Sequence, residues 1–567
     1  MSNQRNLILA VLLSCLVFLG WTFLSARFFP VAAPPSTKIV NGKSVALPTP
    51  ESAANQPTTI RDRGLVLREF PRVAILTPRL AGSINLKGAR IDDLTLTDHR
   101  ETIAKNSPPV RLLSPGGSQD AYFAQFGWSG TGAQLPDANT VWSADGTQLT
   151  PEHPVTLSWN NNKGQLFRIT VSIDKNYMFS VQQNVQNAGP GAIAIKPYGL
   201  VSRVGGSKEV SPWNIHVGPI GTFDGKTDYS VSYKDLDKAG APGTRFSTTG
   251  GWIGFGDKYW QTALVPAQNA AVDAGFCAGE GGVYQADLST PSAIVGPNAT
   301  STSTIRLFAG AKEVAVLDAY KAAGVPQFDH AIDWGWFIWF EQPIFYLLDW
   351  LFRHIGNFGV AIICLTIIVR AILFPVAQRQ FASMAAMRKV QPKMKALQER
   401  HKEDKPRLQQ EMMKLYQEEK INPLGGCLPI FIQLPIFIAL YKVLTLSIEM
   451  RHQPFVLWIQ DLSAPDPLTP VNLFGLLPFN PPPMLHLGVL AIALGVTMWA
   501  TMRLSPQQSM DPTQQQVMKF MPWLMMLFFA PLAAGLQLYY VMNNLLTLAQ
   551  QQLLYARTPG LNDSPPK

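Results

Sequence analysis

Six long runs of apolar residues punctuate the chain, and charged residues are scarce inside them. The first run, Leu7–Leu24, lies near the start, and the other five follow residue 354, at 355–377, 424–446, 484–502, 517–531 and 533–555. A helix needs about 20 apolar residues to cross a hydrocarbon core. The pattern therefore predicts a polytopic α-helical membrane protein with six transmembrane helices, of which 517–531 is short and interrupted by Pro522.

The first apolar run has two alternatives to a retained helix. A cleaved signal peptide is the simpler one, but Leu24-Ser25-Ala26 is a poor small-x-small cleavage site. Leu12-Leu13-Ser14-Cys15 resembles a lipoprotein box, yet the apolar run continues well past Cys15. We expect 1–29 to be a signal anchor with a cytoplasmic N-terminus, and 30–59, rich in Pro, Ala, Ser and Thr, to be a flexible linker.

Between residues 60 and 327 the pattern changes to short segments in which apolar and polar residues alternate. Examples are Leu65–Phe70, Gly164–Ile173 and Ser303–Phe308, with turn clusters such as Asn187–Gly191 between segments. A long helical period appears only at Ala309–Ala323. We predict an all-β, two-sheet sandwich domain over 60–327. Its scattered tryptophans are expected to pack inside it rather than form a sugar platform.

An aromatic segment, 334–353, follows this domain and is interrupted by Glu341, Pro343 and Asp349. It is too charged to span a bilayer comfortably, and Trp and Tyr favour the headgroup level. We predict an amphipathic helix lying on the membrane surface. A helix buried against the β domain is the alternative.

The segment 378–420 separates two apolar runs and holds eleven Lys and Arg against six Asp and Glu, a net charge of +5. So basic a short loop indicates the cytoplasmic side. Apolar residues recur there at helical spacing, at Met384, Met387, Val390, Met394 and Leu397, and again at Leu408, Met412 and Leu415. His401–Pro406 reads as a turn, with Pro406 in the first turn of a second helix. We predict a methionine-lined helical hairpin.

The remaining connections complete the orientation. The Pro-rich segment 447–483 is predicted to be a periplasmic loop, 503–516 a cytoplasmic loop, and 556–567 a short basic cytoplasmic tail. Both termini are then cytoplasmic and the β domain lies outside.

Composition agrees with partial immersion in lipid. The 567 residues exceed one compact domain, and 47% are hydrophobic whereas only 15% are charged. The net charge of +9 is modest. Of the four cysteines, only Cys277 lies outside an apolar run, so no intramolecular disulfide framework and no zinc spacing follow.

Arg370 is the charged residue inside the run 355–377. An arginine near the bilayer centre costs roughly 2.5–3.5 kcal/mol on insertion scales. Thr366, four residues earlier, shares its helix face. The predicted spans contain no carboxylate that could pair with Arg370, so we expect it to face a water-filled cavity. A buried structural pair is the alternative.

Other polar residues in the spans are Gln433, Gln537, Tyr539, Tyr540, Asn543 and Asn544. Ordinary helix–helix hydrogen bonding explains them equally well. A proton-coupled transporter usually needs an intramembrane carboxylate, and intramembrane proteolysis needs a Ser/His or paired-Asp arrangement. Neither pattern occurs in the sequence, and no phosphate-binding glycine loop is present. We expect no enzyme activity, cofactor, metal or direct nucleic-acid binding.

Several spaced motifs now agree in order along Trp334–Leu554. They are Val369–Pro375, Asn422–Pro429, Gln433–Phe437, Phe455–Ser463, Leu538–Tyr540 and Gln550–Gln552. Together they closely resemble the YidC/Oxa/Alb family of membrane insertases. The signal anchor and large β domain further resemble its branch in Gram-negative bacteria. That branch implies a periplasmic β-sandwich, a five-helix core and a surface amphipathic helix.

The resemblance also implies roles for single residues. Arg370 would be the arginine of a substrate groove, with Thr366, Gln433 and Tyr540, rather than Tyr539, on or near it. The hairpin, including Met384, Met387, Met394, Asp404 and Met412, would recruit substrates. Its methionines would form an adaptable surface for apolar segments, unless they simply pack on each other. The short tail departs from relatives with long basic ribosome-binding tails.

The implied function is an insertase and chaperone of the bacterial inner membrane. Its implied partners are nascent membrane proteins, membrane lipids, Sec translocon components, and the signal recognition particle receptor or ribosome. An anion channel or carrier that uses Arg370 is the alternative, although carriers often show internal repeats and none is found here.

Overall fold

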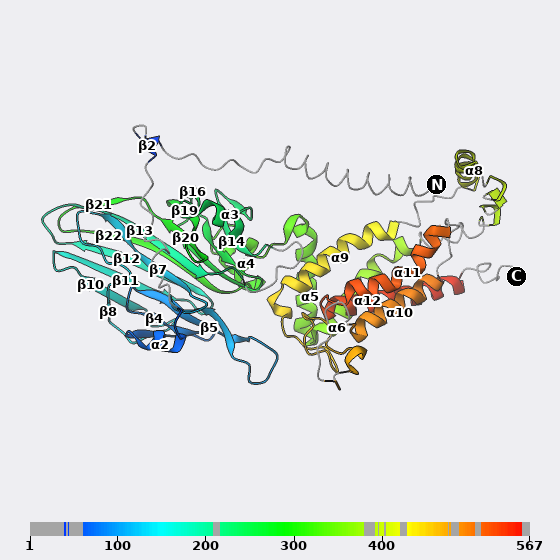
Figure 1. Cartoon of the computed structure of the whole chain (residues 1–567), viewed down its shortest axis with the longest axis horizontal. Coiled ribbons are helices and arrows are strands. Elements are labelled where there is room, and N and C mark those ends of the chain that lie inside the picture. Colours follow the sequence, from blue (N-terminus) through cyan, green and yellow to red (C-terminus); the bar gives the residue numbers. More distant parts are fainter. Residues whose placement is uncertain are drawn as a thin grey trace. The chain divides into compact units, whose positions relative to one another are not determined.

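The computed structural model describes residues 39–40, 43–44, 60–207, 216–378, 390–419, 428–477, 487–504 and 512–557, without 391, 395, 398, 402, 403 and 475. The predicted signal anchor, most of the linker, Met384, Met387 and nearly all of the tail lie outside these residues. The chain divides into two compact units, with the boundary between Asp333 and Trp334. Strands dominate the first and helices the second (Figure 1).

The first unit contains a nine-stranded sheet in the order β15-β14-β17-β18-β22-β12-β11-β10-β8. Its strands are β15 (Lys226–Asp228), β14 (Gly218–Phe223), β17 (Trp252–Gly256), β18 (Trp260–Pro266), β22 (Ala299–Ala311), β12 (Met178–Asn187), β11 (Gln165–Ile173), β10 (Val155–Asn160) and β8 (Ser143–Ala144). Every pairing in this sheet is antiparallel.

The second sheet has eleven strands, nine of them in the order β16-β19-β20-β13-β7-β5-β4-β3-β9, with β21 on β13 and β6 on β5. They are β16 (Thr244–Thr249), β19 (Ala271–Gly279), β20 (Val283–Ser289), β13 (Ile193–Val204), β7 (Tyr122–Thr131), β5 (Arg90–Arg100), β4 (Leu80–Asn85), β3 (Arg72–Leu76), β9 (Gln148–Leu149), β21 (Ala293–Val295) and β6 (Pro109–Leu113). A separate pair joins β1 (Ile39–Val40) and β2 (Lys43–Ser44).

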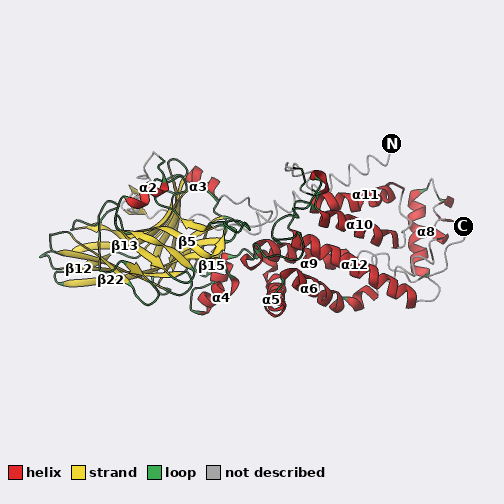
Figure 2. Cartoon of the chain, turned by 90° about the horizontal axis from the view of Figure 1, so that it is seen from below, coloured by secondary structure: helices red, strands yellow, loops and turns green. Residues whose placement is uncertain are grey.

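The two sheets pack face to face, which confirms the predicted sandwich (Figure 2). Gln183 Nε2 on β12 donates to the Gly127 carbonyl of β7 at 2.6 Å, and Trp128 of β7 packs edge-on against Phe167 of β11. The alternation predicted at Gly164–Ile173 is that of β11, in which every second residue is buried. Trp128 and Trp252 are buried, as expected of packing residues.

Two local predictions in this unit are wrong. Leu65–Phe70 does not form a strand, because α2 (Arg63–Arg68) begins there with Asp62 as its N-cap, accepting from Leu65 N at 3.1 Å. The helical period at Ala309–Ala323 also begins too early. The strand β22 continues to Ala311, and α4 (Val314–Ala322) begins only after the carboxylate of Glu313. The remaining helices are α3 (Tyr233–Ala239) and the 3-10 turn η2 (Phe328–Ala331).

Glu313 contacts three segments of the β domain that are distant in the sequence. Arg79 Nη1 donates to its Oε2 at 2.8 Å, the Tyr177 hydroxyl donates to Oε1 at 2.6 Å, and His99 Nε2 lies 3.6 Å from Oε1. Burial alone would raise the pKa of Glu313, but the bonds from His99, Tyr177 and Arg79 outweigh burial and lower this pKa to about 2.

Replacing Glu313 with Gln is expected to lower the unfolding temperature of the β domain at neutral pH. Hydrogen bonds to charged groups contribute roughly 1.5–3 kcal/mol. Because the folded pKa is depressed, this stabilisation is present above the unfolded pKa near 4.5 and is lost as pH falls toward about 2. Thermal unfolding of both proteins between neutral pH and pH 2 checks this, and a difference that is independent of pH would contradict it.

The second unit is helical. Its helices are η3 (Gly335–Phe337), α5 (Ile338–Ile355), α6 (Phe358–Ile372), α8 (Lys405–Glu418), α9 (Leu428–Leu446), η5 (Ile448–Met450), η6 (Pro470–Asn472), α10 (Val489–Leu504), α11 (Pro512–Phe529) and α12 (Ala534–Arg557). Within the part of the chain that the structure describes, no helix is both long enough and apolar enough to cross a membrane. The count of six spans stays a prediction.

Candidate functional site

Arg370 lies in the last turn of α6 and joins this helix to α12. Its Nε donates to Asn543 Oδ1 at 2.8 Å, and its Nη2 donates to Thr547 Oγ1 at 2.7 Å and to the Asn543 carbonyl at 3.3 Å. Asn543 and Thr547 are four residues apart, so one face of α12 presents both to the guanidinium. The arginine therefore has a defined orientation.

The partners of Arg370 are all neutral. Among the described residues, no carboxylate pairs with it, and its Nη1 makes no hydrogen bond. The side chain is only partly buried. An amide and a hydroxyl orient the guanidinium but do not neutralise it, so the site keeps a positive charge.

The other predicted groove residues occupy different settings. Thr366 has no exposed surface, and its hydroxyl donates to the Ile362 carbonyl one turn earlier at 2.7 Å. Gln433 Nε2 on α9 donates to the Tyr539 hydroxyl at 3.1 Å, so the structure brings Gln433 to Tyr539. Tyr540 is half-buried, and its ring lies 4.7 Å from Phe529.

Two further polar residues of α12 act within the helix packing. Asn544 Nδ2 donates to Thr497 Oγ1 of α10 at 3.2 Å, and Gln537 Nε2 donates to carbonyls at the end of α11, including Leu532 O at 2.8 Å. The sequence analysis named Asn543 as a polar residue of the spans but predicted no partner for it, and it did not name Thr547. The available signal was their i, i+4 spacing in a largely apolar helix.

The α9–α10 loop, described over residues 447–477, contacts the start of α6. Asn357, the N-cap of α6, donates from Nδ2 to the Phe455 carbonyl at 2.9 Å and accepts from Val360 N at 3.1 Å. A Cβ on Gly359 would lie 2.8 Å from Phe455 Cβ and closer still to its ring. Glycine at this position therefore leaves the space that Phe455 fills.

The same loop supplies acceptors for α10 and α12. Asp466 is buried, and its Oδ2 accepts from Leu490 N at 2.8 Å in the first turn of α10. The carbonyls of Ala464 and Leu462 accept from Ala534 N at 2.7 Å and Gly535 N at 2.9 Å. The first N–H groups of a helix lack partners within it, so the loop closes one end of three helices.

Lys442 is the one charged residue of the apolar run 424–446, and from the sequence its ammonium is predicted to extend toward the membrane interface at the end of the span. The structure contradicts this prediction. Instead, Lys442 is 7% exposed, and its Nζ donates to the Trp334 carbonyl at 2.9 Å. The ammonium is held inside the protein because a backbone acceptor at the start of the second unit reaches it.

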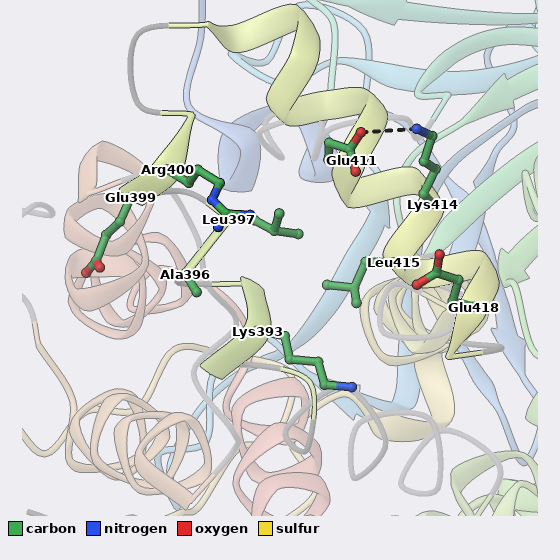
Figure 3. A pocket seen from close by; sticks show the side chains of 9 residues that line it. All are labelled: Lys393, Ala396, Leu397, Glu399, Arg400, Glu411, Lys414, Leu415 and Glu418. Carbon is green, nitrogen blue, oxygen red and sulfur yellow. Dashed lines mark hydrogen bonds and ion pairs between the residues drawn. The ribbon is translucent and has the colours of Figure 1, made fainter.

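The hairpin is described by helical residues between 390 and 400 and by α8. Asp404 caps α8 by accepting from Arg407 N at 3.1 Å, and Pro406 lies in the first turn, as its sequence predicts. A cavity of about 790 Å³ lies between the two arms (Figure 3). Leu397 and Leu415 line it together with charged side chains such as Lys393 and Glu418.

The methionines of the hairpin have unequal positions. Met394 is buried with Val390 and Leu415, and Met412 packs against this cluster. Met413 is exposed instead. In the described residues, the predicted methionine positions thus pack inside the hairpin, as the alternative interpretation held. Whether the hairpin recruits substrates stays a prediction.

Two known families match consecutive parts of the chain, one over the β-sandwich and one over the helical unit that contains Arg370. Residues 72–347 match the YidC periplasmic domain, and residues 350–560 match the 60Kd inner membrane protein family. The chain is thus an inner-membrane protein with a periplasmic β domain. It belongs to the YidC family of membrane protein insertases.

Curated relatives align over almost the whole chain. It is 51% identical to the membrane protein insertase YidC of Zymomonas mobilis over 98% of this chain and 96% of the relative, and 44% identical to that of Rhizobium johnstonii at the same coverage. An active YidC insertase crystal structure is similar at 19% identity and a TM-score of 0.36, covering 85% of this chain and 92% of that one. The curated relatives and the family matches identify the protein as a membrane protein insertase.

Proposed function

We propose that substrates enter the membrane through a hydrophilic groove centred on Arg370, with the insertase working alone or beside the Sec translocon. One observation supports this most strongly. The guanidinium is held between α6 and α12 by neutral groups, and its charge is not balanced by an ion pair among the described residues. Such a charge in an apolar setting retains water and attracts anions.

The groove would shorten the apolar distance that a polar segment must cross. Arg370 attracts acidic residues of the arriving segment, while the hydrophobic helix of the substrate moves into lipid along α9 and α11. Exposed large apolar residues line α11, including Phe520, Leu524 and Phe528. Burial of apolar surface drives the step at about 25 cal/mol per Å², and no nucleotide is required.

The remaining groove residues divide into two roles in this proposal. Tyr540 and Gln433 are both partly exposed and are assigned to contact the substrate. Thr366 is fully buried and bonded to the Ile362 carbonyl, so it is assigned a packing role in α6, one turn before Arg370.

We assign to the hairpin the recruitment of substrates, of the signal recognition particle receptor or of the ribosome. This recruitment precedes the entry of the substrate into the groove. The sequence of 378–420 has a net charge of +5, and Lys393 forms a partly exposed ion pair with Glu419. Among the described hairpin residues, the exposed Met413 on α8, rather than the buried Met394, is the methionine available to an incoming apolar segment. We further propose that both termini of the chain lie in the cytoplasm, on the same side as the hairpin.

A photocrosslinker at Tyr540 is expected to trap a single-span substrate stalled during insertion. A second probe at Met413 should trap the same substrate at a shorter nascent-chain length. Tyr346 on α5 is the matched control, because it is also a tyrosine and is exposed. Adducts are measured by electrophoresis across chain lengths. Adducts at Tyr346 with none at Tyr540 would refute the groove assignment.

A further inference from the structure

The α9–α10 loop exposes a group of large apolar side chains that we name the apolar rim. Its members are Val456, Leu457, Leu473, Phe474, Leu476 and Leu477. Leu457 is 83% exposed and Leu476 is 82% exposed. A concentration of exposed leucine and phenylalanine in one loop marks an interaction surface.

The part of the loop that carries the rim, residues 454–477, has few charged residues, whereas Glu449, Arg451 and His452 precede it. Residues 454–477 contain no Lys, Arg or His, and their acidic residues are Asp461 and Asp466. Asp461 accepts from Ser463 N at 2.8 Å, and Asp466 accepts from Trp458 Nε1 at 2.9 Å. Both carboxylates are therefore hydrogen-bonded within the loop, and the exposed side chains of this stretch are mainly apolar, with Gln460 as an exposed polar exception.

The rim is built into defined turns rather than left as loose chain. Leu457, Leu473 and Phe474 have φ values of 57°, 51° and 59°, in the left-handed region that L residues with a side chain rarely adopt. Backbone bonds hold the turns, since Phe474 N donates to Thr469 O at 2.9 Å and Leu477 N donates to Asn472 O at 3.1 Å. Such strain persists where the surrounding structure enforces it, often at functional positions.

The position of the loop identifies the medium that meets the rim. The β domain is periplasmic, and α6 begins after it through α5, so the start of α6 lies on the periplasmic side. The Phe455 carbonyl is bonded to the N-cap of α6, and Asp466 is bonded to the start of α10. The loop therefore lies at the periplasmic ends of the core helices, where the bilayer interface is found.

We infer that the apolar rim inserts into the outer leaflet and anchors the periplasmic ends of α6, α10 and α12 to lipid. Interfacial segments of this kind insert apolar side chains about 5–10 Å into the headgroup and acyl boundary. An uncharged surface favours lipid over a charged protein partner. The inference is independent of the proposed groove, because it uses no residue of that site.

A fluorescence experiment tests the anchor in the full-length protein. An environment-sensitive fluorophore is attached to Leu457→Cys or Leu476→Cys after the native cysteines are replaced by alanine. The protein is reconstituted into phosphatidylcholine vesicles with or without spin-labelled lipid. Ile294→Cys is the matched control, because Ile294 is 80% exposed but belongs to β21 of the β domain.

Labels at 457 and 476 are expected to emit at shorter wavelength and to be quenched by spin-labelled lipid, whereas the label at 294 is not. Equal quenching at all three positions, or none at 457 and 476, would overturn the anchor. A blue shift that requires an added membrane-protein partner and is absent in pure lipid would also overturn it, in favour of a protein interface.

A second variant separates anchoring from folding. Asparagine tolerates the left-handed conformation better than leucine, so Leu457→Asn should leave thermal stability in detergent unchanged or higher. Lipid quenching of a label at 476 should nevertheless fall, because one of the apolar side chains that anchor the rim is replaced by a polar one. Unchanged quenching at 476 in this variant would assign Leu457 a purely structural role and overturn the inference.

Discussion

Replacing Arg370 with alanine is expected to slow the insertion of substrates with acidic translocated tails far more than that of substrates with neutral tails. A charge-assisted contact contributes on the order of 1.5–3 kcal/mol, and about 1.4 kcal/mol corresponds to a factor of ten. The loss for acidic tails should thus be roughly tenfold or more. Insertion into proteoliposomes, measured by protease protection of the tail, provides the readout.

The structure complicates this variant, because Arg370 also ties α6 to α12. The double variant Asn543→Ala with Thr547→Val removes the two hydrogen bonds from Arg370 to these side chains, leaves the bond to the Asn543 carbonyl, and keeps the charge. It should affect acidic and neutral tails alike, whereas Arg370→Ala should discriminate between them. Arg370→Lys, which keeps a positive charge, is expected to be milder than Arg370→Ala.

A different pattern would count against charge attraction. If Arg370→Ala and the Asn543/Thr547 variant reduce both tails equally, the arginine serves helix packing alone. The defect for acidic tails should also shrink at high salt, because exposed charges are screened. If the difference between Arg370→Ala and the wild-type protein for acidic tails stays the same at high salt, Arg370 is shielded from water and ions.

Replacing Gly359 with valine is expected to displace the α9–α10 loop and destabilise the helical unit. An added side chain would overlap Phe455, whose carbonyl is bonded to Asn357 and whose N–H donates to Ile459 O at 2.9 Å. Overpacking a well-filled site costs typically 1–3 kcal/mol. Faster proteolysis within the loop and a lower unfolding temperature are the expected results.

The companion variant Phe455→Ala makes this prediction specific. Truncating Phe455 creates the room that valine needs, so Gly359→Val with Phe455→Ala should be more stable than Gly359→Val alone. Gly296→Ala is a benign control, because nothing lies within 4 Å of the added Cβ. If the double variant is less stable than either single variant, the two residues do not share this space.

The sandwich was predictable because its strands are buried on one face. In β11 the burial of every second residue is the same alternation that the sequence shows at Gln165–Ile173. The error at Leu65–Phe70 has a local cause. Residues 65–70, Leu-Val-Leu-Arg-Glu-Phe, do not alternate strictly, and the Asp62 cap that starts α2 was overlooked.

The candidate site was only half predictable. An arginine inside an apolar run is easily recognised in a sequence as a candidate functional residue. Nothing in the segment around Arg370, however, indicates that its partners are 173 and 177 residues away on α12. The burial of Lys442 was missed for the same reason, since its acceptor is a backbone carbonyl 108 residues earlier. Charge is visible in a sequence, whereas a distant neutral partner is not.

The distance in sequence between Arg370 and Asn543 has a consequence for the synthesis of the insertase itself. The 173 residues between them take roughly 9–35 s to synthesise at about 5–20 residues per second. Throughout that interval α6 exists without the amide and hydroxyl that later hold its guanidinium. A chain interrupted before α12 would lack both side-chain partners of this arginine, so its guanidinium would keep its charge without the bonds that orient it.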